Sequence, residues 1–260
     1  MMRPMARRYL PPSFESIHLA DFLVREEVFH GYRAGLKRFP PLTCALIAIC
    51  VGMHVATGLT GGVLRPRELE VLVAWGARSR ELVDAGEIWR LMSCVFLHGD
   101  MLHIGLNMLA LFGLGRILEA VYGPARVLLI FAVSGFTGSL AGHLVGGPVS
   151  VGASGAIFGL LGAGVAFGLL NGRDLPASMR RVLGRGLLPW VVLNIIIGFV
   201  IPRIDNAGHV GGLIGGAAVA ALLSDRLMPW SAPDSRFGWA FAVLASAALL
   251  LPLSIAVIGQ

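Results

Sequence analysis

The chain has 260 residues, of which 56% are hydrophobic and only 14% are charged, and its mean hydropathy is +0.77. A water-soluble enzyme of this size needs far more charged surface, so the composition excludes that class and indicates a polytopic membrane protein. The formal net charge is +6, but the cations are scattered along the chain rather than gathered in one patch, which argues against a nucleic-acid partner.

The first 40 residues form a polar segment of their own. They contain no apolar core followed by a cleavage site of small residues, so we expect no removable signal peptide. Acidic residues such as Glu15, Asp21 and Glu26 also argue against a mitochondrial transit peptide. We expect a short cytoplasmic segment with some helix over residues 1–40.

Apolar windows of about 17–25 residues can cross a bilayer as α-helices. Seven windows of this kind follow the first segment. They cover residues 41–60, 101–119, 126–146, 153–171, 186–202, 207–224 and 237–257. The last four are rich in glycine and alanine, which is typical of helices that pack closely within lipid. The sequence therefore predicts an all-α polytopic membrane protein.

Seven spans place most of the basic residues on one side of the membrane. These residues are Arg3, Arg7, Arg8, Lys37, Arg38, Arg116, Arg126, Arg173, Arg180, Arg181, Arg185, Arg226 and Arg236. The positive-inside rule then predicts a cytoplasmic N-terminus and an outer C-terminus. Residues 61–98 lie on the outer side yet hold arginines balanced by acidic residues, so we expect a folded, partly interfacial element there.

The first polar motif brackets the start of the second span. Trp89, Arg90 and His98 precede this start, and His103 and Asn107 follow it. His103 and Asn107 are four residues apart and so share one helix face. A lone histidine on an apolar face is usually structural, but polar residues stacked at the outer end of a span are costly in lipid and are functional candidates.

The second motif, Gly152-Ala153-Ser154-Gly155, opens the fourth span. Near the start of a helix, unpaired backbone N–H groups could stabilise a developing oxyanion beside Ser154. The alternative is a serine that only bonds to a carbonyl of its own helix. The sequence is not a G-x-S-x-G elbow, because Ala156 occupies the last position, so it does not indicate a soluble hydrolase.

The third motif carries His209 on the sixth span, next to a stripe of small residues. The stripe residues are Gly208, Gly212, Gly216 and Ala220, and the serine helix has the matching stripe Gly155, Gly159 and Ala163. Small residues at this spacing let two helices approach closely, which would bring Ser154 and His209 together as a nucleophile and its base. The alternative is a pair of glycine stripes with incidental polar neighbours. Asp205 and Asn206 are expected to cap the helix, which leaves a dyad rather than a triad.

These motifs together resemble the rhomboid family of intramembrane serine proteases. They follow the family's order over about residues 41–224, and four motifs in order are far more specific than any one alone. The resemblance implies a six-helix rhomboid core at 41–224, after the segment 1–40, and a linker with one additional C-terminal transmembrane helix at 225–260. This six-plus-one form favours the plasma membrane of a bacterium over the mitochondrial form, whose extra helix comes first.

The resemblance also implies roles for single residues. It makes Ser154 the nucleophile and His209 the general base, and it assigns the oxyanion hole to His103, Asn107 and the Ser154 backbone N–H. Supporting positions are His98, Gly152, Phe158, Trp89 and Arg90. Among these, the Phe158 ring is expected to pack on the catalytic histidine, and Trp89 and Arg90 to support the first outer loop.

Further implications of the resemblance concern the surroundings of the site. Glu119 matches an acidic position at the cytoplasmic end of the second span, and residues 186–202 match a mobile gate for substrate. The expected substrates are single-span membrane proteins met within the lipid bilayer, and the oligomeric state stays open. No cofactor or metal is expected, because Cys44, Cys50 and Cys94 lack the spacing of metal ligands and read as packing residues.

Other membrane functions fit the sequence less well. An inactive rhomboid-like protein that binds membrane clients would have lost the serine or the histidine, and this chain keeps both. A transporter predicts inverted repeats and broken helices, and no convincing repeat is present. A metalloprotease needs H-E-x-x-H and an aspartyl protease needs two membrane carboxylates, and the sequence has neither.

Overall fold

A computed structural model describes residues 35–59, 68–172, 175, 177–201 and 204–223. Within these ranges, five helices are long and apolar enough to cross a membrane, and a sixth apolar helix has 17 residues. The prediction of an all-α polytopic membrane protein is therefore confirmed. The expected seventh span at 237–257 lies outside the described residues, as do residues 1–34 of the N-terminal segment.

The apolar helices lie close to the predicted windows. They are α2 (Pro41–Gly58), α6 (Met101–Tyr122), α7 (Pro124–Val145), α8 (Ser154–Leu170), α10 (Leu188–Val200) and α11 (Asn206–Leu223). The second window was predicted to end at residue 119, but α6 continues to Tyr122 because the first breaker is Gly123, whose φ of +76° suits glycine. Pro124 then starts α7 as its first residue, where a missing N–H is tolerated.

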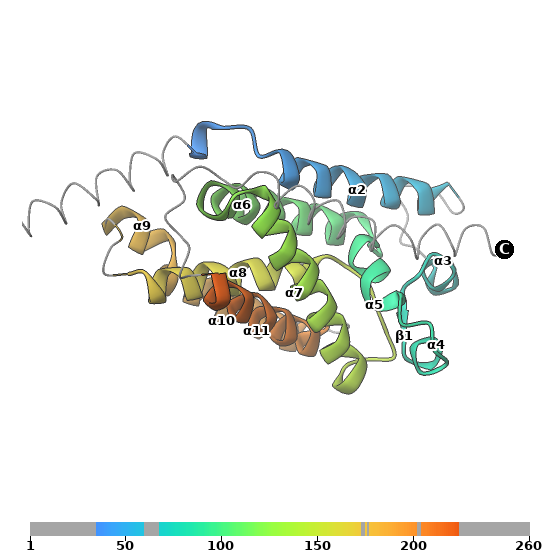
Figure 1. Cartoon of the computed structure of the whole chain (residues 1–260). Helices are drawn as coiled ribbons and strands as arrows, with labels where there is room; N and C mark the ends of the chain where they lie inside the picture. Colours follow the sequence, from blue (N-terminus) through green and yellow to red (C-terminus); the bar gives the residue numbers. More distant parts are fainter. Residues whose placement is uncertain (1–34, 60–67, 173–174, 176, 202–203, 224–260) are drawn as a thin grey trace, which may run out of the picture.

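The segment expected to fold between the first two spans does so over its described part. It contains α3 (Leu69–Ala74), β1 (Arg78–Ser79), α4 (Arg80–Asp84), α5 (Arg90–Ser93) and a 3₁₀ turn at Cys94–Phe96. Strand β1 pairs antiparallel with β2 (Val149–Ser150), which lies in the connection between α7 and α8. Figure 1 shows α3, α4 and β1 together at one end of the helix bundle. We call residues 68–100 the outer loop, after the side of the membrane that the sequence predicts for it.

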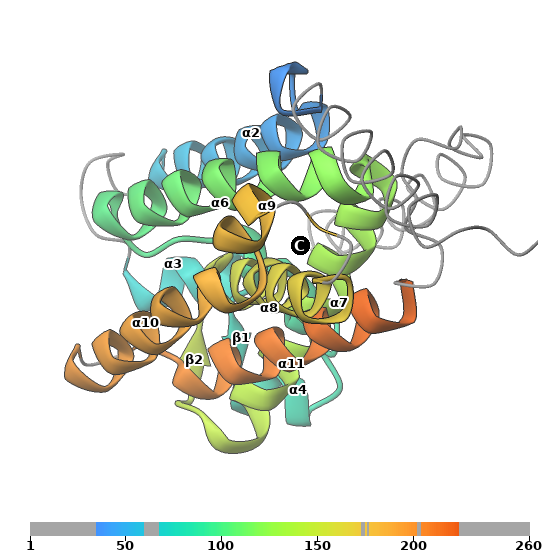
Figure 2. The same ribbon diagram turned by 90° about the vertical axis from the view of Figure 1, so that its left-hand side faces the viewer.

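Helix α8 occupies the middle of the bundle, as Figure 2 shows, with α6, α7 and α11 around it. Residues from Ala156 to Gly164 are buried without interruption. The glycine stripes meet as predicted: a Cβ at Gly212 would overlap the carbonyl oxygen of Gly155. Helix α7 joins the same contact, since a Cβ at Gly138 would lie 2.7 Å from the carbonyl oxygen of Gly208. Helices α7, α8 and α11 thus touch through their main chains.

Helices α2 and α6 are tied at the opposite end of the bundle by Glu119. Its carboxylate accepts a hydrogen bond from the Thr43 hydroxyl and from the backbone N–H groups of Thr43 (2.5 Å) and Leu42 (3.3 Å). These N–H groups belong to the first turn of α2, where no helical carbonyl is available to them. A carboxylate at a helix N-terminus is also favoured by the helix dipole. Glu119 therefore caps a helix 76 residues away from it in sequence.

Helix α10 is the most exposed of the apolar helices. Of the window that contains it, 17% is buried, against 33–44% in the other long spans. It is preceded by the short helix α9 (Ala177–Val182) and a 3₁₀ turn at Gly184–Leu187. Within the window predicted at 186–202, the α-helix begins at Leu188, directly after this 3₁₀ turn, and ends at Val200. Pro189 suits its place in the first turn of this helix.

The main-chain contact of α11 predicts that Gly212→Ala will destabilise the fold. The added methyl group must push the backbones of α8 and α11 apart, and overpacking of this kind costs about 1–3 kcal/mol. The melting temperature in detergent should fall clearly below that of the parent. The matched control is Gly113→Ala on α6, where a Cβ meets nothing within 4 Å and should not destabilise. Equal melting temperatures for both variants would contradict the packing described here.

The arginine asymmetry predicts opposite sides for the outer loop and the α9 region. Ala85 and Arg181 are exposed, whereas Ser79 on β1 is buried and unsuitable for labelling. In a background without native cysteines, Ala85→Cys should react with an impermeant thiol reagent added outside intact cells. Arg181→Cys should react only after the membrane is opened. Reaction of both from the same side would contradict the topology.

Candidate functional site

Ser154 is the first residue of α8 and lies half-buried at the end of the bundle that the outer loop covers. The preceding turn depends on Gly152, whose φ of +123° is rarely adopted by other residues. The N–H of Gly152 donates a 2.9 Å hydrogen bond to the carbonyl of Cys94. The approach to Ser154 is thus fixed by a glycine turn bonded to the outer loop.

His209 lies in the first turn of α11 and is buried. Its ring stacks on the ring of Phe158, with centroids 4.1 Å apart and planes 10° from parallel. Phe158 is one turn along α8 from Ser154, so this stacking holds the imidazole on the serine helix. The hydrogen bonds of the described residues do not join Ser154 to His209, and His209 Nδ1 is buried without a hydrogen-bond partner.

His103 of α6 packs against Gly152 in the turn that precedes Ser154. A Cβ on Gly152 would lie 2.6 Å from His103 Nε2, so only glycine leaves space for this ring. The neighbouring ring of His98 is 5.0 Å away, edge to face. His98 Nε2 lies 3.5 Å from the backbone N–H of Ala153. Both predicted histidines therefore contact the residues directly before Ser154.

Asn107 is buried on the same face of α6, as its spacing from His103 predicts. Its side-chain amide donates a 2.9 Å hydrogen bond to the carbonyl of His103, within its own helix. This bond uses one of the two N–H donors of the amide. The other N–H remains the group that could serve a ligand at this end of α6.

Arg90 organises the outer loop. Its guanidinium donates to the carbonyls of Val73 (2.6 Å) and Ala77 (3.1 Å), and to the Glu87 carboxylate (2.8 Å). The cation also lies 4.6 Å from the centre of the Trp89 ring. The Trp89-Arg90 pair therefore stabilises the outer loop, and the contacts of Arg90 given above do not include Ser154.

The environment of His98 keeps this side chain uncharged. Burial, with smaller contributions from His103 and His54, lowers its pKa to about 3. Its carbonyl accepts a hydrogen bond from His54 Nδ1 of α2 at 3.3 Å. His98 thus links α2, the outer loop and the turn before Ser154 as a neutral group at ordinary pH.

Asp205 and Asn206 differ in their roles at the start of α11. The carboxylate of Asp205 accepts from the N–H of Gly208 at 2.8 Å and caps the helix, as predicted. Asn206 was expected to share this role, but its amide instead donates to the carbonyl of Ile195 in α10 at 3.4 Å. The reason is position: Asn206 is already the first residue of the helix and faces the end of α10.

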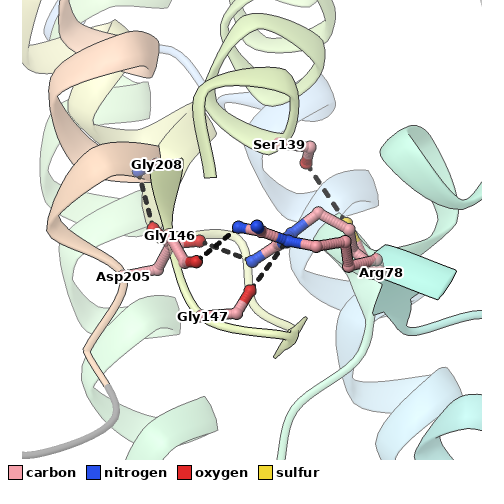
Figure 3. A network of polar contacts seen from close by, with 8 residues as sticks. Arg78, Ser139, Gly146, Gly147, Asp205 and Gly208 are labelled. Atoms are coloured by element: carbon pink, nitrogen blue, oxygen red, sulfur yellow. Dashed lines mark hydrogen bonds and ion pairs between the residues drawn. The ribbon is translucent and has the colours of Figure 1, made fainter. Parts of the chain in front are cut away.

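Sequence reasoning missed one charged group at this end of the bundle. Arg78 of β1 is fully buried and pairs with Asp205 at 3.0 Å (Figure 3). The residues are 127 positions apart, so no local pattern could reveal the pair. Within the described residues, no group of three histidine, cysteine or acidic side chains could hold a metal ion.

Comparison with known proteins places this arrangement in a family. Residues 85–226 match the family model for the rhomboid domain. Rhomboid protease GluP of Bacillus subtilis is 39% identical over 184 residues, which are 71% of this chain and 35% of that protein. Rhomboid protease GlpG of Serratia proteamaculans is 30% identical over 223 residues, 85% of this chain and 76% of that protein.

A plant relative extends the comparison. RHOMBOID-like protein 5 of Arabidopsis thaliana is 42% identical over 144 residues, 54% of this chain and 46% of that protein. The chain thus spans less than half the length of GluP and of this plant protein. The match over more than half of the chain shows that it belongs to the rhomboid family.

Proposed function

We propose that this rhomboid-family chain is an intramembrane serine endopeptidase in which Ser154 attacks the peptide bond and His209 is the general base. The observation that carries the proposal is the stacking of His209 on Phe158, one turn from Ser154, between two helices whose backbones touch. An imidazole fixed beside a serine at a helix start supplies a base for that hydroxyl. The relatives named as rhomboid proteases support the same activity.

The first step needs donors for the oxyanion that forms on the attacked carbonyl. The start of α8 supplies free backbone N–H groups, including that of Ser154. His103 contacts Gly152 directly, and Asn107 has an amide N–H left after its bond to His103. His103 and Asn107 belong to α6, whereas the proposed base His209 belongs to α11. They would form the oxyanion hole.

The proton transfers follow from the same arrangement. His209 takes the hydroxyl proton as Ser154 attacks, and then gives it to the leaving amine, so that an acyl-enzyme remains. Water next attacks the acyl group with His209 again as base, and the serine is released. The polar residues at this end of the bundle give water access to a site otherwise enclosed by apolar helices.

Substrates would enter between α10 and its neighbours. Of the long spans that the structure describes, the one containing α10 is the least buried. Asn206 of α11 donates a side-chain hydrogen bond to the carbonyl of Ile195 in α10. A helix held this loosely can move aside for a substrate in the lipid. We expect single-span membrane proteins as substrates, with cleavage near the outer face because Ser154 lies at that end of α8.

Ser154→Ala and His209→Ala should each abolish cleavage of a single-span substrate found by screening a library of such proteins. A fluorophosphonate probe should label the parent at Ser154 and neither variant, because both remove a part of the dyad. EDTA should leave the activity unchanged. Melting curves in detergent control for folding. Cleavage by folded Ser154→Ala, or strong inhibition by the chelator, would overturn the serine mechanism.

Asn107→Ala and His103→Ala should lower kcat more than they change KM, because the donors act mainly when the oxyanion forms. Loss of one such donor typically costs about 10²–10³ in rate. The backbone N–H remains in both variants, so some activity should persist. Steady-state kinetics of the single and double variants test this. Unchanged kcat in the double variant would remove both residues from the proposed oxyanion hole.

Substrate helices should be cut where they unwind easily. A peptide bond inside a helix is shielded by the helix hydrogen bonds, and glycine and proline weaken those bonds locally. Replacing such residues near the outer end of an identified substrate by leucine should stop cleavage. Leucine replacements near the other end are the control. Equal cleavage of all variants, or cuts on the cytoplasmic side, would contradict this account.

A further inference from the structure

The buried cation Arg78 lies where three segments of the chain meet. Its side chain has no exposed area, and it stands on β1, opposite Ser150 of β2. Its Nη1 donates to the carbonyl of Gly147 at 3.1 Å, and its Nη2 donates to the Asp205 carboxylate at 3.0 Å. Figure 3 shows these bonds converging from the outer loop, the α7–α8 connection and the start of α11.

Asp205 transmits this contact to the first turn of α11. One carboxylate oxygen faces Arg78, and the other accepts from the N–H of Gly208 at 2.8 Å. The carbonyl of the same residue accepts from the N–H of His209 at 3.0 Å. Any shift of Asp205 therefore shifts the backbone that carries the histidine.

The end of α7 leaves space for the carboxylate. A Cβ at Gly142 would overlap Asp205 Oδ2, and a Cβ at Gly146 would lie 2.8 Å from Oδ1. The carboxylate thus fits between two glycines and a buried guanidinium. Because the carboxylate is confined in this way, the position of Asp205 relative to α7 and β1 is well defined.

We propose that Arg78 and Asp205 are a positioning pair, which sets the place of His209 relative to the segment that leads into Ser154. The inference rests on the proposed function, because it assigns a role in the reactivity of that dyad. Arg78 holds the α7–α8 connection through Gly147 and β2, and it holds the α11 start through Asp205. One cation outside the membrane helices therefore contacts both the segment that precedes Ser154 and the start of the helix that carries His209.

The first experiment separates positioning from stability in the purified full chain. Asp205→Asn keeps an acceptor for Gly208 but leaves Arg78 unpaired, so its melting temperature should fall. The double variant Arg78→Met/Asp205→Asn removes the unpaired charge, and its melting temperature should return toward the parent value. The rate of fluorophosphonate labelling at Ser154 is measured on each, well below melting. The control is Asp84→Asn, which changes the contact of the exposed Asp84 carboxylate with His143 at the same end.

Positioning predicts that the double variant stays about 10- to 100-fold slower in the labelling step, with unchanged affinity for the probe, because small displacements of reacting groups cost rates of this order. The Asp84→Asn control should react at the parent rate. A labelling rate that returns with the melting temperature would overturn the positioning role. A parent that is not labelled at all would overturn the proposed function itself.

A second experiment moves Asp205 without changing any charge. Gly142→Ala on α7 places a methyl group against the carboxylate, whereas Gly113→Ala on α6 places one where nothing lies within 4 Å. The labelling rate should fall in Gly142→Ala and stay at the parent value in Gly113→Ala, at temperatures where both are folded. Equal rates in these two variants would overturn the inference even if the first experiment supported it.

Discussion

Helices α7, α8 and α11 meet through carbonyl oxygens and Cα atoms, and the rest of the structure depends on this contact. Within lipid there is no hydrophobic driving force between helices, so close van der Waals packing has to supply the association. Gly138, Gly155 and Gly212 make that packing possible, because a Cβ at Gly138 or Gly212 would meet a neighbouring backbone. The same closeness stacks His209 on Phe158 and brings it to the serine helix.

Polar groups gather where these three helices reach the outer loop. Backbone groups at helix ends are unsatisfied by their own helix and need partners in lipid. The loop supplies them: Cys94 accepts from the turn before Ser154, and Arg78 binds both Gly147 and the cap residue of α11. Arg90 in turn holds the loop itself in shape. The loop is thus part of the packed structure rather than a connection.

The sequence predicted what depends on local pattern. The lengths of the apolar windows predicted the spans. The four-residue spacing of small residues within α8 and within α11 predicted a close contact between these helices, which the structure contains at Gly155 and Gly212. The glycines of α7 have similar spacing and complete the contact, although the two predicted stripes do not include them. The Arg78–Asp205 pair could not be predicted, because it depends on how distant segments fold together. The contact of Asn206 with α10 could not be predicted either, because asparagine at a helix start is most simply interpreted as a cap.

The two-residue pairing of β1 with β2 has a consequence for how activity can be altered. It connects the outer loop by main-chain bonds to the turn that leads into Ser154. A ligand or antibody fragment that binds the aqueous side of the outer loop and displaces β1 would therefore also displace the turn before the candidate nucleophile. It would not have to bind within the lipid. Inhibitors of this kind need neither a reactive group nor the solubility in membranes that a substrate mimic requires.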